Sequence, residues 1–202
     1  MDLAWLQVTA AIVGAYLIGS IPFGLLSSRL CQTQDPRTTG SGNIGFTNVL
    51  RVSGKKAGVV TLLGDAGKGF LVSWLAKGYF QVEVEVLFVA AAVILGHIFS
   101  LFLKFKGGKG VATALAAIGG IHLTLGLTAT AVWVVAVWIF RYSSGGAIAA
   151  FLVLPLLSFF FSPSTSLLIF SVVISILVIF RHKDNICRLL NGTEGKLGTH
   201  SS

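Results

Sequence analysis

The sequence predicts an all-α integral membrane protein, and three observations support this prediction. Hydrophobic residues make up 54% of the 202 positions and charged residues only 11%, whereas a soluble domain carries about a quarter charged residues. Several apolar runs approach the roughly 20 residues that a membrane-spanning helix needs. The basic residues gather in a few segments between these runs. We therefore expect one membrane domain over residues 1–202, without a linker or an extramembrane domain.

The apolar runs divide into seven expected spans. The first covers residues 3–30 with a break at Gly19-Ser20-Ile21-Pro22, because proline kinks a membrane helix and a nearby serine can satisfy the freed backbone. No Lys or Arg precedes this run, so we expect it to be retained rather than removed as a signal peptide. Residues 111–140 are too long for one span, and Gly119-Gly120 is the expected break. The remaining spans are residues 57–80, 84–103, 145–161 and 166–180, the last two joined by Ser162-Pro163-Ser164.

Charge placement supports this number of spans. Of the fifteen Lys and Arg residues, thirteen flank or fill the segments 29–56, 104–109, 141 and 181–196. With seven spans all four segments fall on one face of the membrane, whereas six spans would put the last segment opposite the others. The positive-inside rule assigns that face to the cytoplasm. We therefore expect seven transmembrane helices, with the N terminus outside and the C terminus in the cytoplasm.

The first basic loop, TTGSGNIGFTNVLR, covers residues 38–51 and is rich in glycine and neutral donors. Its glycines match G-x-G-x-x-G, but a dinucleotide-binding site needs a preceding strand, and here a membrane helix precedes the loop. Glycines still let backbone amides converge on an anion. Ser41, Asn43, Thr47 and Asn48 would add donors, and Arg51 could bind an oxyanion with two hydrogen bonds. A flexible, solvated turn is the alternative interpretation.

The second basic loop, LKFKGGKGVA, covers residues 103–112. Its three glycines permit an amide-lined turn before a helix that we expect to begin at Val111, an arrangement that suits a phosphate. It does not satisfy the Walker A pattern. The lysines are also explained as topology signals or as anchors for anionic lipid, and for Lys106 that explanation is as good as a role in the site.

The other polar residues divide into candidate site residues and structural ones. His97 and His182 lie beside the basic loops and are candidates for hydrogen bonding or acid–base chemistry. Asp65 and Lys68 share a helix face and are expected to form a structural pair inside a span. We expect a structural role for His122, no particular role for the two cysteines, and no metal site, because acidic ligands are few. The polar segments together predict a cytoplasmic site for one or two phosphorylated substrates, at least one of which arrives from lipid.

Three stretches resemble the cytoplasmic motifs of the bacterial acyl-phosphate:glycerol-3-phosphate acyltransferase (PlsY) family. They are GSGNIGFTNVLR, GHIFSLFLKFKGGKGVAT and HKDNICRLLNGTEGK, in that order along the chain. No histidine has an aspartate five residues later, which excludes the H-x-x-x-x-D acyltransferases.

The resemblance implies acyl transfer from acyl phosphate to the 1-hydroxyl of sn-glycerol 3-phosphate. The products would be 1-acyl-glycerol 3-phosphate (lysophosphatidic acid) and phosphate, in the first committed step of phospholipid synthesis. It implies a multi-pass protein of the bacterial cytoplasmic (inner) membrane whose site faces the cytoplasm. It implies no cofactor and no nucleic-acid partner. The lipid bilayer and the soluble enzyme that makes acyl phosphate are the expected partners.

The resemblance also assigns roles to residues of this sequence. The expected catalytic residues are Ser41, Lys104, His182 and Asn185. The expected acyl-phosphate-binding residues are Ser41, Asn43, Gly107, Gly108, Lys109 and Gly110. The expected glycerol-3-phosphate-binding residues are Arg51, Lys104, Ser143, Ser144, His182, Asn185 and Arg188. It also gives supporting roles to Thr47, Asn48, His97, Glu194 and Lys196, whereas the supporting role expected for Asp65 and Lys68 follows from their shared helix face and not from the resemblance.

The sequence leaves several alternatives open. The proton acceptor could be His182, Glu194 or the substrate phosphate, of which the substrate phosphate is preferred because this face has few carboxylates. A membrane transporter of a phosphorylated solute is the main rival, but transporters usually carry internal repeats and midplane sites, and neither is evident here. A structural protein that binds anionic lipid explains the lysines but not the Gly, Asn and Ser residues of the first loop. The sequence does not decide acyl chain length, oligomeric state, which loop holds which phosphate, or a role for the last four residues.

Overall fold

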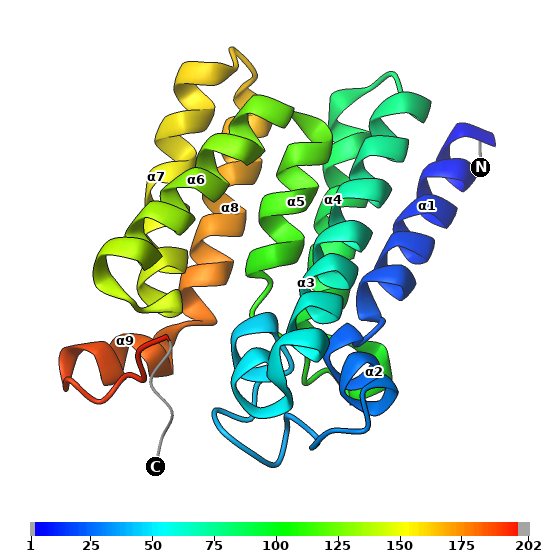
Figure 1. The fold of residues 1–202 in the computed structure, drawn as a ribbon. Helices are drawn as coiled ribbons and strands as arrows, with labels where there is room; N and C mark the ends of the chain where they lie inside the picture. Colours follow the sequence, from blue (N-terminus) through cyan, green and yellow to red (C-terminus); the bar gives the residue numbers. More distant parts are fainter. Residues whose placement is uncertain (1–2, 198–202) are drawn as a thin grey trace. The chain divides into compact units, whose positions relative to one another are not determined.

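The computed structural model describes residues 3–197 and forms helices throughout, with no β-strand in that range, which confirms the all-α prediction (Figure 1). The elements are α1 (Leu3–Ser20), α2 (Phe23–Leu30), α3 (Phe46–Tyr79), α4 (Glu83–Ile98), the 3₁₀ turn η1 (Leu101–Leu103), α5 (Val111–Ile121), α6 (Leu123–Phe140), α7 (Ser143–Phe161), α8 (Thr165–Phe180) and α9 (Lys183–Leu190). The chain divides into two compact units, Met1–Ile121 and His122–Ser202. The last four residues lie outside the described range, and the expectation of a single domain stays a prediction.

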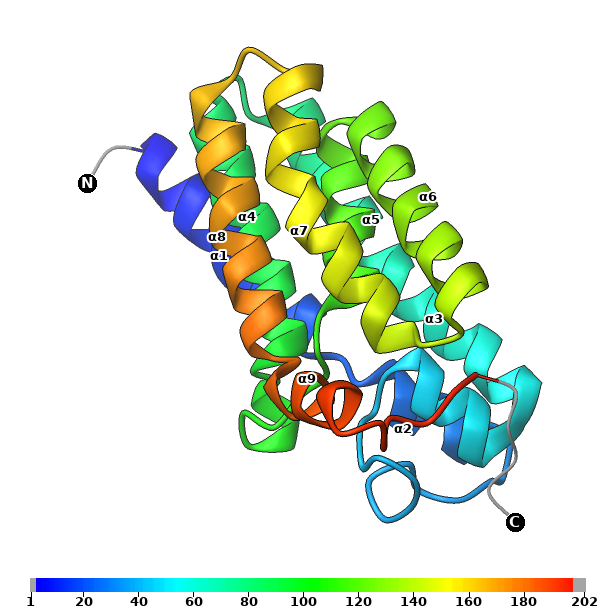
Figure 2. The same cartoon turned by 90° about the vertical axis from the view of Figure 1, so that its left-hand side faces the viewer.

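The first unit contains α1 to α5. Helix α1 packs along α4, and α3 packs against α2, α4 and α5 (Figures 1 and 2). Small residues allow the close approach: a methyl group on Gly96 of α4 would strike the Tyr16 carbonyl of α1, and one on Gly69 of α3 would strike the Thr113 carbonyl of α5. Such small-residue contacts are typical of helices packed within a membrane.

The second unit contains α6 to α9. Helix α7 lies against both α6 and α8, and α9 turns away from α8 by 60° (Figure 2). Its core consists of fully buried apolar side chains: Leu125, Ala129, Ala150, Phe151, Leu154 and Leu167. Helix α9 and the segment after it therefore form the polar end of a compact apolar bundle.

The break predicted at Gly19-Ser20-Ile21-Pro22 is confirmed. Helix α1 ends at Ser20, α2 begins at Phe23, and the two are bent by 41°. The carbonyls of Ser20 and Ile21 at the break find side-chain donors, because Ser100 Oγ donates to the Ser20 oxygen at 2.5 Å and Lys68 Nζ to the Ile21 oxygen at 2.8 Å. Side chains from other helices therefore satisfy the broken helix.

The break predicted at Gly119-Gly120 is wrong, because α5 continues through both glycines to Ile121. Gly120 is needed for packing: its Cα faces the Phe70 carbonyl and the Trp74 amide of α3, where a methyl group would not fit. The chain breaks instead at His122, whose Nδ1 accepts the Leu125 N–H at 3.3 Å and caps α6. His122 is thus structural, as expected.

Several helix ends also differ from the predicted spans. Helix α3 begins at Phe46 rather than at residue 57, and its first turns join the rest at Gly54, where φ is 84° and ψ is 177°. The second half of the predicted first loop is therefore helical. Helix α4 ends at Ile98, before the 3₁₀ turn, rather than at residue 103. Helix α7 begins at Ser143, so both predicted site serines open a helix.

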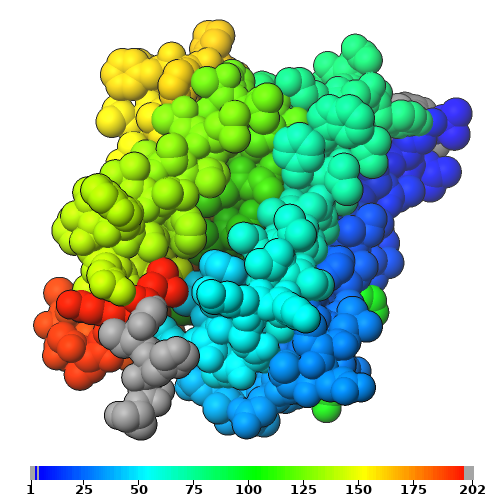
Figure 3. All heavy atoms as spheres, in the orientation of Figure 1, coloured from blue at the N-terminus to red at the C-terminus, as the bar shows by residue number. Residues whose placement is uncertain are grey.

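The outer surfaces carry large apolar side chains, as lipid-facing helices require. Examples more than half exposed are Leu63 of α3, Trp138 of α6, Phe160 of α7 and Ile176 of α8. The surface of α3, cyan to green-cyan in Figure 3, is part of this layer. By length and composition, 4 described helices can cross a membrane, or up to 6 if each bent pair counts as one span.

Helix α5 is the remaining apolar helix that a count of seven would need. Its 11 residues extend about 16 Å, half of the ~30 Å hydrocarbon layer. The prediction of seven spans, with its orientation of the termini, therefore stays a prediction.

Candidate active site

The first loop is held together by the buried side chain of Asn48. Its Oδ1 accepts the Ser41 N–H at 2.9 Å, and its Nδ2 donates to the carbonyls of Pro36 and Asn43, both at 2.8 Å. Gly40 has a φ of 66°, and a methyl group there would strike the Asn48 side chain. Asn48 therefore fixes the turn that presents Ser41, in agreement with its expected supporting role.

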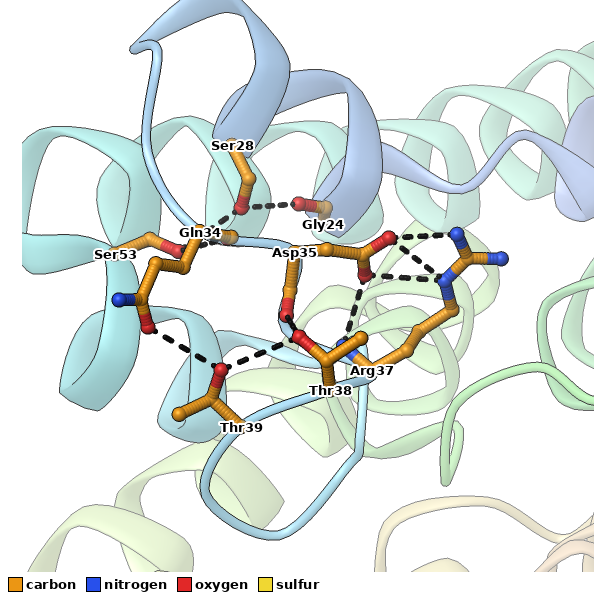
Figure 4. Close-up of polar contacts among 8 residues, drawn as sticks. All are labelled: Gly24, Ser28, Gln34, Asp35, Arg37, Thr38, Thr39 and Ser53. Atoms are coloured by element: carbon orange, nitrogen blue, oxygen red, sulfur yellow. Dashed lines mark hydrogen bonds and ion pairs between the residues drawn. The ribbon is translucent and has the colours of Figure 1, made fainter.

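A second network fixes the start of the same loop (Figure 4). The carboxylate of Asp35 forms a bidentate ion pair with Arg37, whose Nη2 lies 2.6 Å from Oδ2, and its Oδ1 also accepts the Arg37 N–H at 2.9 Å. The hydrogen bond from Arg37 holds the pKa of Asp35 below its ordinary value, against the opposing effect of partial burial. Sequence reasoning missed this pair, although the Asp-Pro-Arg order is a signal for an Asp-initiated turn.

The second loop uses its glycine amides internally. The N–H groups of Gly107 and Gly108 donate to the carbonyls of Ile98 and His97 at 3.1 and 3.0 Å. We expected the glycine amides of this loop to bind a phosphate, but the amides of Gly107 and Gly108 bind the end of α4 instead. The glycines instead let the turn lie directly on the end of α4, because a methyl group on Gly107 would strike the His97 carbonyl.

The basic side chains of the first unit are presented outward. Arg51 lies on the exposed face of the first turns of α3, and Lys104 and Lys106 are exposed on the second loop. Lys104 has a φ of 51°, which turns the chain sharply after η1. Figures 1 and 2 both show the two loops at the same end of this unit. The unit therefore gathers cationic side chains at one end, as the anion-binding interpretation requires.

Beneath the second loop lies a buried charged group made of Asp65, Lys68 and His97. Asp65 Oδ1 is 2.9 Å from Lys68 Nζ and 3.3 Å from His97 Nδ1, and all three side chains are at most 5% exposed. The predicted structural pair on α3 is therefore a group of three that includes α4.

In the second unit, Glu194 gathers the predicted glycerol-3-phosphate-binding residues. Its Oε1 accepts Ser144 Oγ and Asn185 Nδ2, both at 2.6 Å, and its Oε2 accepts Arg188 Nε at 2.7 Å. Burial raises the pKa of Glu194, but the hydrogen bonds from Ser144, Arg188 and Asn185 outweigh it, and the pKa lies below its ordinary value. A carboxylate with three donors stays ionised and is a weak proton acceptor.

His182 lies at the start of α9 and is buried. Its Nδ1 is 2.7 Å from the Val178 carbonyl oxygen, which can only accept, so Nδ1 carries the proton. The neutral ring then has its lone pair on Nε2. That tautomer is the one in which Nε2 can accept a proton or a hydrogen bond from a substrate.

The segment after α9 is attached to the turn between α6 and α7. The Leu197 N–H donates to the Arg141 carbonyl at 2.8 Å, and Arg141 Nη2 donates back to the Leu197 carbonyl at 3.2 Å. Lys196 Nζ lies 5.8 Å from the centre of the Tyr142 ring. Sequence reasoning gave Arg141 only a topological role, and no local pattern links it to residue 197. The attachment fixes Glu194, which lies within the attached segment.

Comparison with known proteins gives one consistent result. Residues 9–192 match the family described as glycerol-3-phosphate acyltransferase. A glycerol-3-phosphate acyltransferase from Nitrosospira multiformis is 44% identical over 201 residues, covering 98% of this chain and 100% of the relative. One from Burkholderia ambifaria (strain ATCC BAA-244) is 43% identical over 195 residues, covering 96% and 92%.

Solved structures agree with the sequence relatives. The glycerol 3-phosphate form of PlsY (YgiH), an integral membrane glycerol 3-phosphate acyltransferase, is 38% identical with a TM-score of 0.90, covering 96% of both chains. The lysophosphatidic acid form of the same protein gives a TM-score of 0.88 with the same coverage. The family match covers the first two motif stretches and the beginning of the third, and the solved structures cover 96% of the chain, so this chain is an integral membrane protein of the glycerol-3-phosphate acyltransferase family.

Proposed function

We propose that this protein transfers an acyl group from acyl phosphate to the 1-hydroxyl of sn-glycerol 3-phosphate. The products are lysophosphatidic acid and inorganic phosphate, in the first committed step of phospholipid synthesis. One observation carries the proposal: the chain matches a glycerol-3-phosphate acyltransferase family along residues 9–192, which include Ser41, Lys104 and His182. Membership of that family sets the transporter alternative aside.

The reaction does not require a covalent intermediate with the protein. An acyl phosphate is an activated mixed anhydride, so the substrate hydroxyl attacks the acyl carbon directly. The new ester C–O bond forms, the bond to the phosphate oxygen breaks, and phosphate leaves. The protein must hold two mutually repelling anions in line and stabilise the charge that develops on the carbonyl and the leaving phosphate.

The first unit supplies the acyl-phosphate-binding residues in this proposal. Asn48 fixes the turn that carries Ser41, and Asn43 stabilises the same turn by accepting the Gly45 N–H at 2.8 Å. Lys109 follows the two glycines in the sequence, so the turn that rests on α4 also sets the position of Lys109. Gly107 and Gly108 contribute by letting the turn lie directly against the end of α4, where a side chain would not fit. Gly110 contributes its positive φ of 89°, with which the turn leads into α5.

Glycerol 3-phosphate is assigned to cationic and neutral donors. Arg51 and Lys104 are exposed on the first unit, and Arg188 is 40% exposed in the second. In the second unit Glu194 orients Ser144, Asn185 and Arg188 before substrate arrives. Ser143, which precedes Ser144 at the start of α7, is the remaining residue assigned to glycerol 3-phosphate.

The proton released by the hydroxyl goes to the substrate phosphate in the preferred scheme. Glu194 is disfavoured as acceptor because its pKa is lowered by three donors. The Nδ1–H tautomer of His182 leaves Nε2 able to accept a hydrogen bond from the hydroxyl. If the phosphate is the acceptor, His182→Asn retains residual turnover with an unchanged acidic limb of the pH profile, because that limb then follows the phosphate, whose second pKa is about 6. Loss of that limb identifies His182 as the base.

The location and the partners belong to the same proposal. The basic segments 29–56, 104–109, 141 and 181–196 support a bacterial cytoplasmic membrane location with the site facing the cytoplasm. Acyl phosphate is a labile amphiphile, so the soluble enzyme that produces it is the expected partner.

The test is turnover of the purified full-length protein with palmitoyl phosphate and glycerol 3-phosphate, followed by phosphate release and lysophosphatidic acid formation. Palmitoyl-CoA is the control donor. Product that requires both substrates and does not form from the CoA ester supports the proposal. Turnover with palmitoyl-CoA, or phosphate release without glycerol 3-phosphate, contradicts it.

A further inference from the structure

The buried group Asp65–Lys68–His97 links three separate parts of the first unit. Lys68 Nζ donates to the Ile21 carbonyl at the break before α2, 2.8 Å away. The same nitrogen lies 2.9 Å from Asp65 Oδ1, and that oxygen is 3.3 Å from His97 Nδ1. Charges inside a membrane span are costly, and where they occur they are paired and usually functional.

His97 carries the connection to the second loop in two ways. Its carbonyl accepts the Gly108 N–H at 3.0 Å. Its ring lies against the same residue, because a methyl group on Gly108 would strike His97 Nε2. The ring therefore has Asp65 at its Nδ1 edge and the Gly107–Gly108 turn at its Nε2 edge. Rotation of the ring would remove the surface on which the turn rests.

We propose that Asp65 and His97 are positioning residues for the Gly107–Gly108 turn, and that Lys68 holds the Asp65 carboxyl group in its place beside the His97 ring. The inference rests on the proposed function, because this turn places Lys104 and Lys109 for substrate phosphate. Asp65 and Lys68 lie outside the three motif stretches, and the sequence predicted only that they pair; their link to His97 and the turn comes from the folded contacts.

The alternative role is a simple ion pair that fastens α3 within the bundle. The fastening role and the positioning role predict different kinetics for the double variant D65N/K68M. Replacing both members of a buried pair removes the charges together and is often neutral for stability, whereas removing one leaves the other uncompensated. A fastening role then predicts wild-type stability and wild-type kinetics for the double variant. A positioning role predicts wild-type stability with altered kinetics.

The experiment compares D65N/K68M, H97Q and their combination with the wild-type full-length protein. We expect a melting temperature within about 4 °C of wild type for the double variant. We expect KM for palmitoyl phosphate to rise about ten- to hundredfold, because small misplacements of binding groups have effects of that size. Since Asp65 acts through His97, the combined variant should be no worse than H97Q alone.

Trypsin cleavage at Lys104, Lys106 and Lys109 gives a readout that does not depend on catalysis. We expect faster cleavage in D65N/K68M and H97Q, because the turn has lost its support. S73A is the matched control, since the buried hydroxyl of Ser73 lies on the same helix and has no hydrogen-bond partner in the described structure. It should match wild type in every measurement.

The outcomes separate the two proposals. Wild-type KM values and wild-type cleavage in a stable D65N/K68M overturn the positioning role and leave acyl transfer intact. Absence of turnover in the wild type overturns the proposed function, and cleavage rates then test the support of the turn by themselves. Kinetic losses that add independently in the combined variant show that Asp65 does not act through His97, which also overturns the inference.

Discussion

Two carboxylates organise the polar residues of this protein in different surroundings. Asp65 lies in the middle of α3, is 3% exposed, and faces a lysine that is equally buried. Glu194 lies after the last helix, is 11% exposed, and faces an arginine that is 40% exposed. The first is fixed by packed helices, and the second by an attached terminal segment.

The difference indicates a division of labour. A buried pair in a rigid helix holds the geometry of its surroundings and cannot be broken without a large penalty. Glu194 lies on a segment that hydrogen bonds to Arg141 hold in place, and such an attachment opens at a lower free-energy cost than packed helices do. Asp65 is therefore suited to permanent support, and Glu194 to holding donors that must respond to a substrate.

The largest effect is expected from Lys68→Met. This change leaves the Asp65 carboxylate buried without its cation and removes the donor to Ile21. Breaking one side of a buried pair costs about 3–5 kcal/mol, so the melting temperature in detergent should fall strongly. Adding Asp65→Asn should recover most of that loss. No recovery would mean that the contact to Ile21, and not the pair, carries the stability.

Glu194→Gln should affect activity more than stability. The glutamine keeps the shape but places an N–H₂ group where three donors converge from Ser144, Asn185 and Arg188. We expect kcat/KM for glycerol 3-phosphate to fall about ten- to hundredfold, equivalent to about 1.4–2.8 kcal/mol, with a small change in melting temperature. A collapse of stability comparable to that of Lys68→Met would remove the contrast between the two carboxylates.

The same residue predicts a pH dependence. Its pKa in the folded protein lies below the ordinary value of 4.5, because the hydrogen bonds and the Arg188 charge outweigh the effect of burial. Its stabilising contribution is therefore complete above pH 4.5 and is lost as the pH falls through the lower folded value. Melting temperatures between about pH 6 and 3 should show an acid decline that is weaker in Glu194→Gln. Parallel declines in both proteins would assign the effect to other carboxylates.

Sequence patterns predicted the features that depend on local chemistry. Pro22 follows a glycine and a serine and ends α1, although Pro155 alone does not break α7. The Gly- and Lys-rich stretch 104–110 is a loop because its residues favour turns. The break at His122 was not predictable, because in the sequence Gly120 looks like a helix break, whereas in the fold it is a packing contact of α5 with α3. Nor could the sequence show that the amides of Gly107 and Gly108 bond to α4, since that depends on where α4 ends. Long-range contacts, such as Arg141 with Leu197, leave no periodic signal.

A third carboxylate, Asp35, is the most exposed of the three, and we expect its replacement to have the smallest effect on stability. Its side chain and that of Arg37 are 35% and 49% exposed, so water and salt screen their ion pair. Asp35→Asn removes the charge but keeps an oxygen to accept the Arg37 N–H, and should cost less than about 1 kcal/mol. Asp35→Ala removes that acceptor as well and should cost about 1 kcal/mol more.

The measurement is the melting temperature of both Asp35 variants at low and high salt. The small loss in Asp35→Asn should shrink further in high salt, whereas the larger loss in Asp35→Ala should persist because a turn hydrogen bond is not an ion pair. Equal losses in the two variants would mean that charge, and not the turn, orders the start of the first loop. A loss in Asp35→Asn as large as that in Lys68→Met would mean that burial is not what separates the three carboxylates, since an exposed pair would then match a buried one in structural importance.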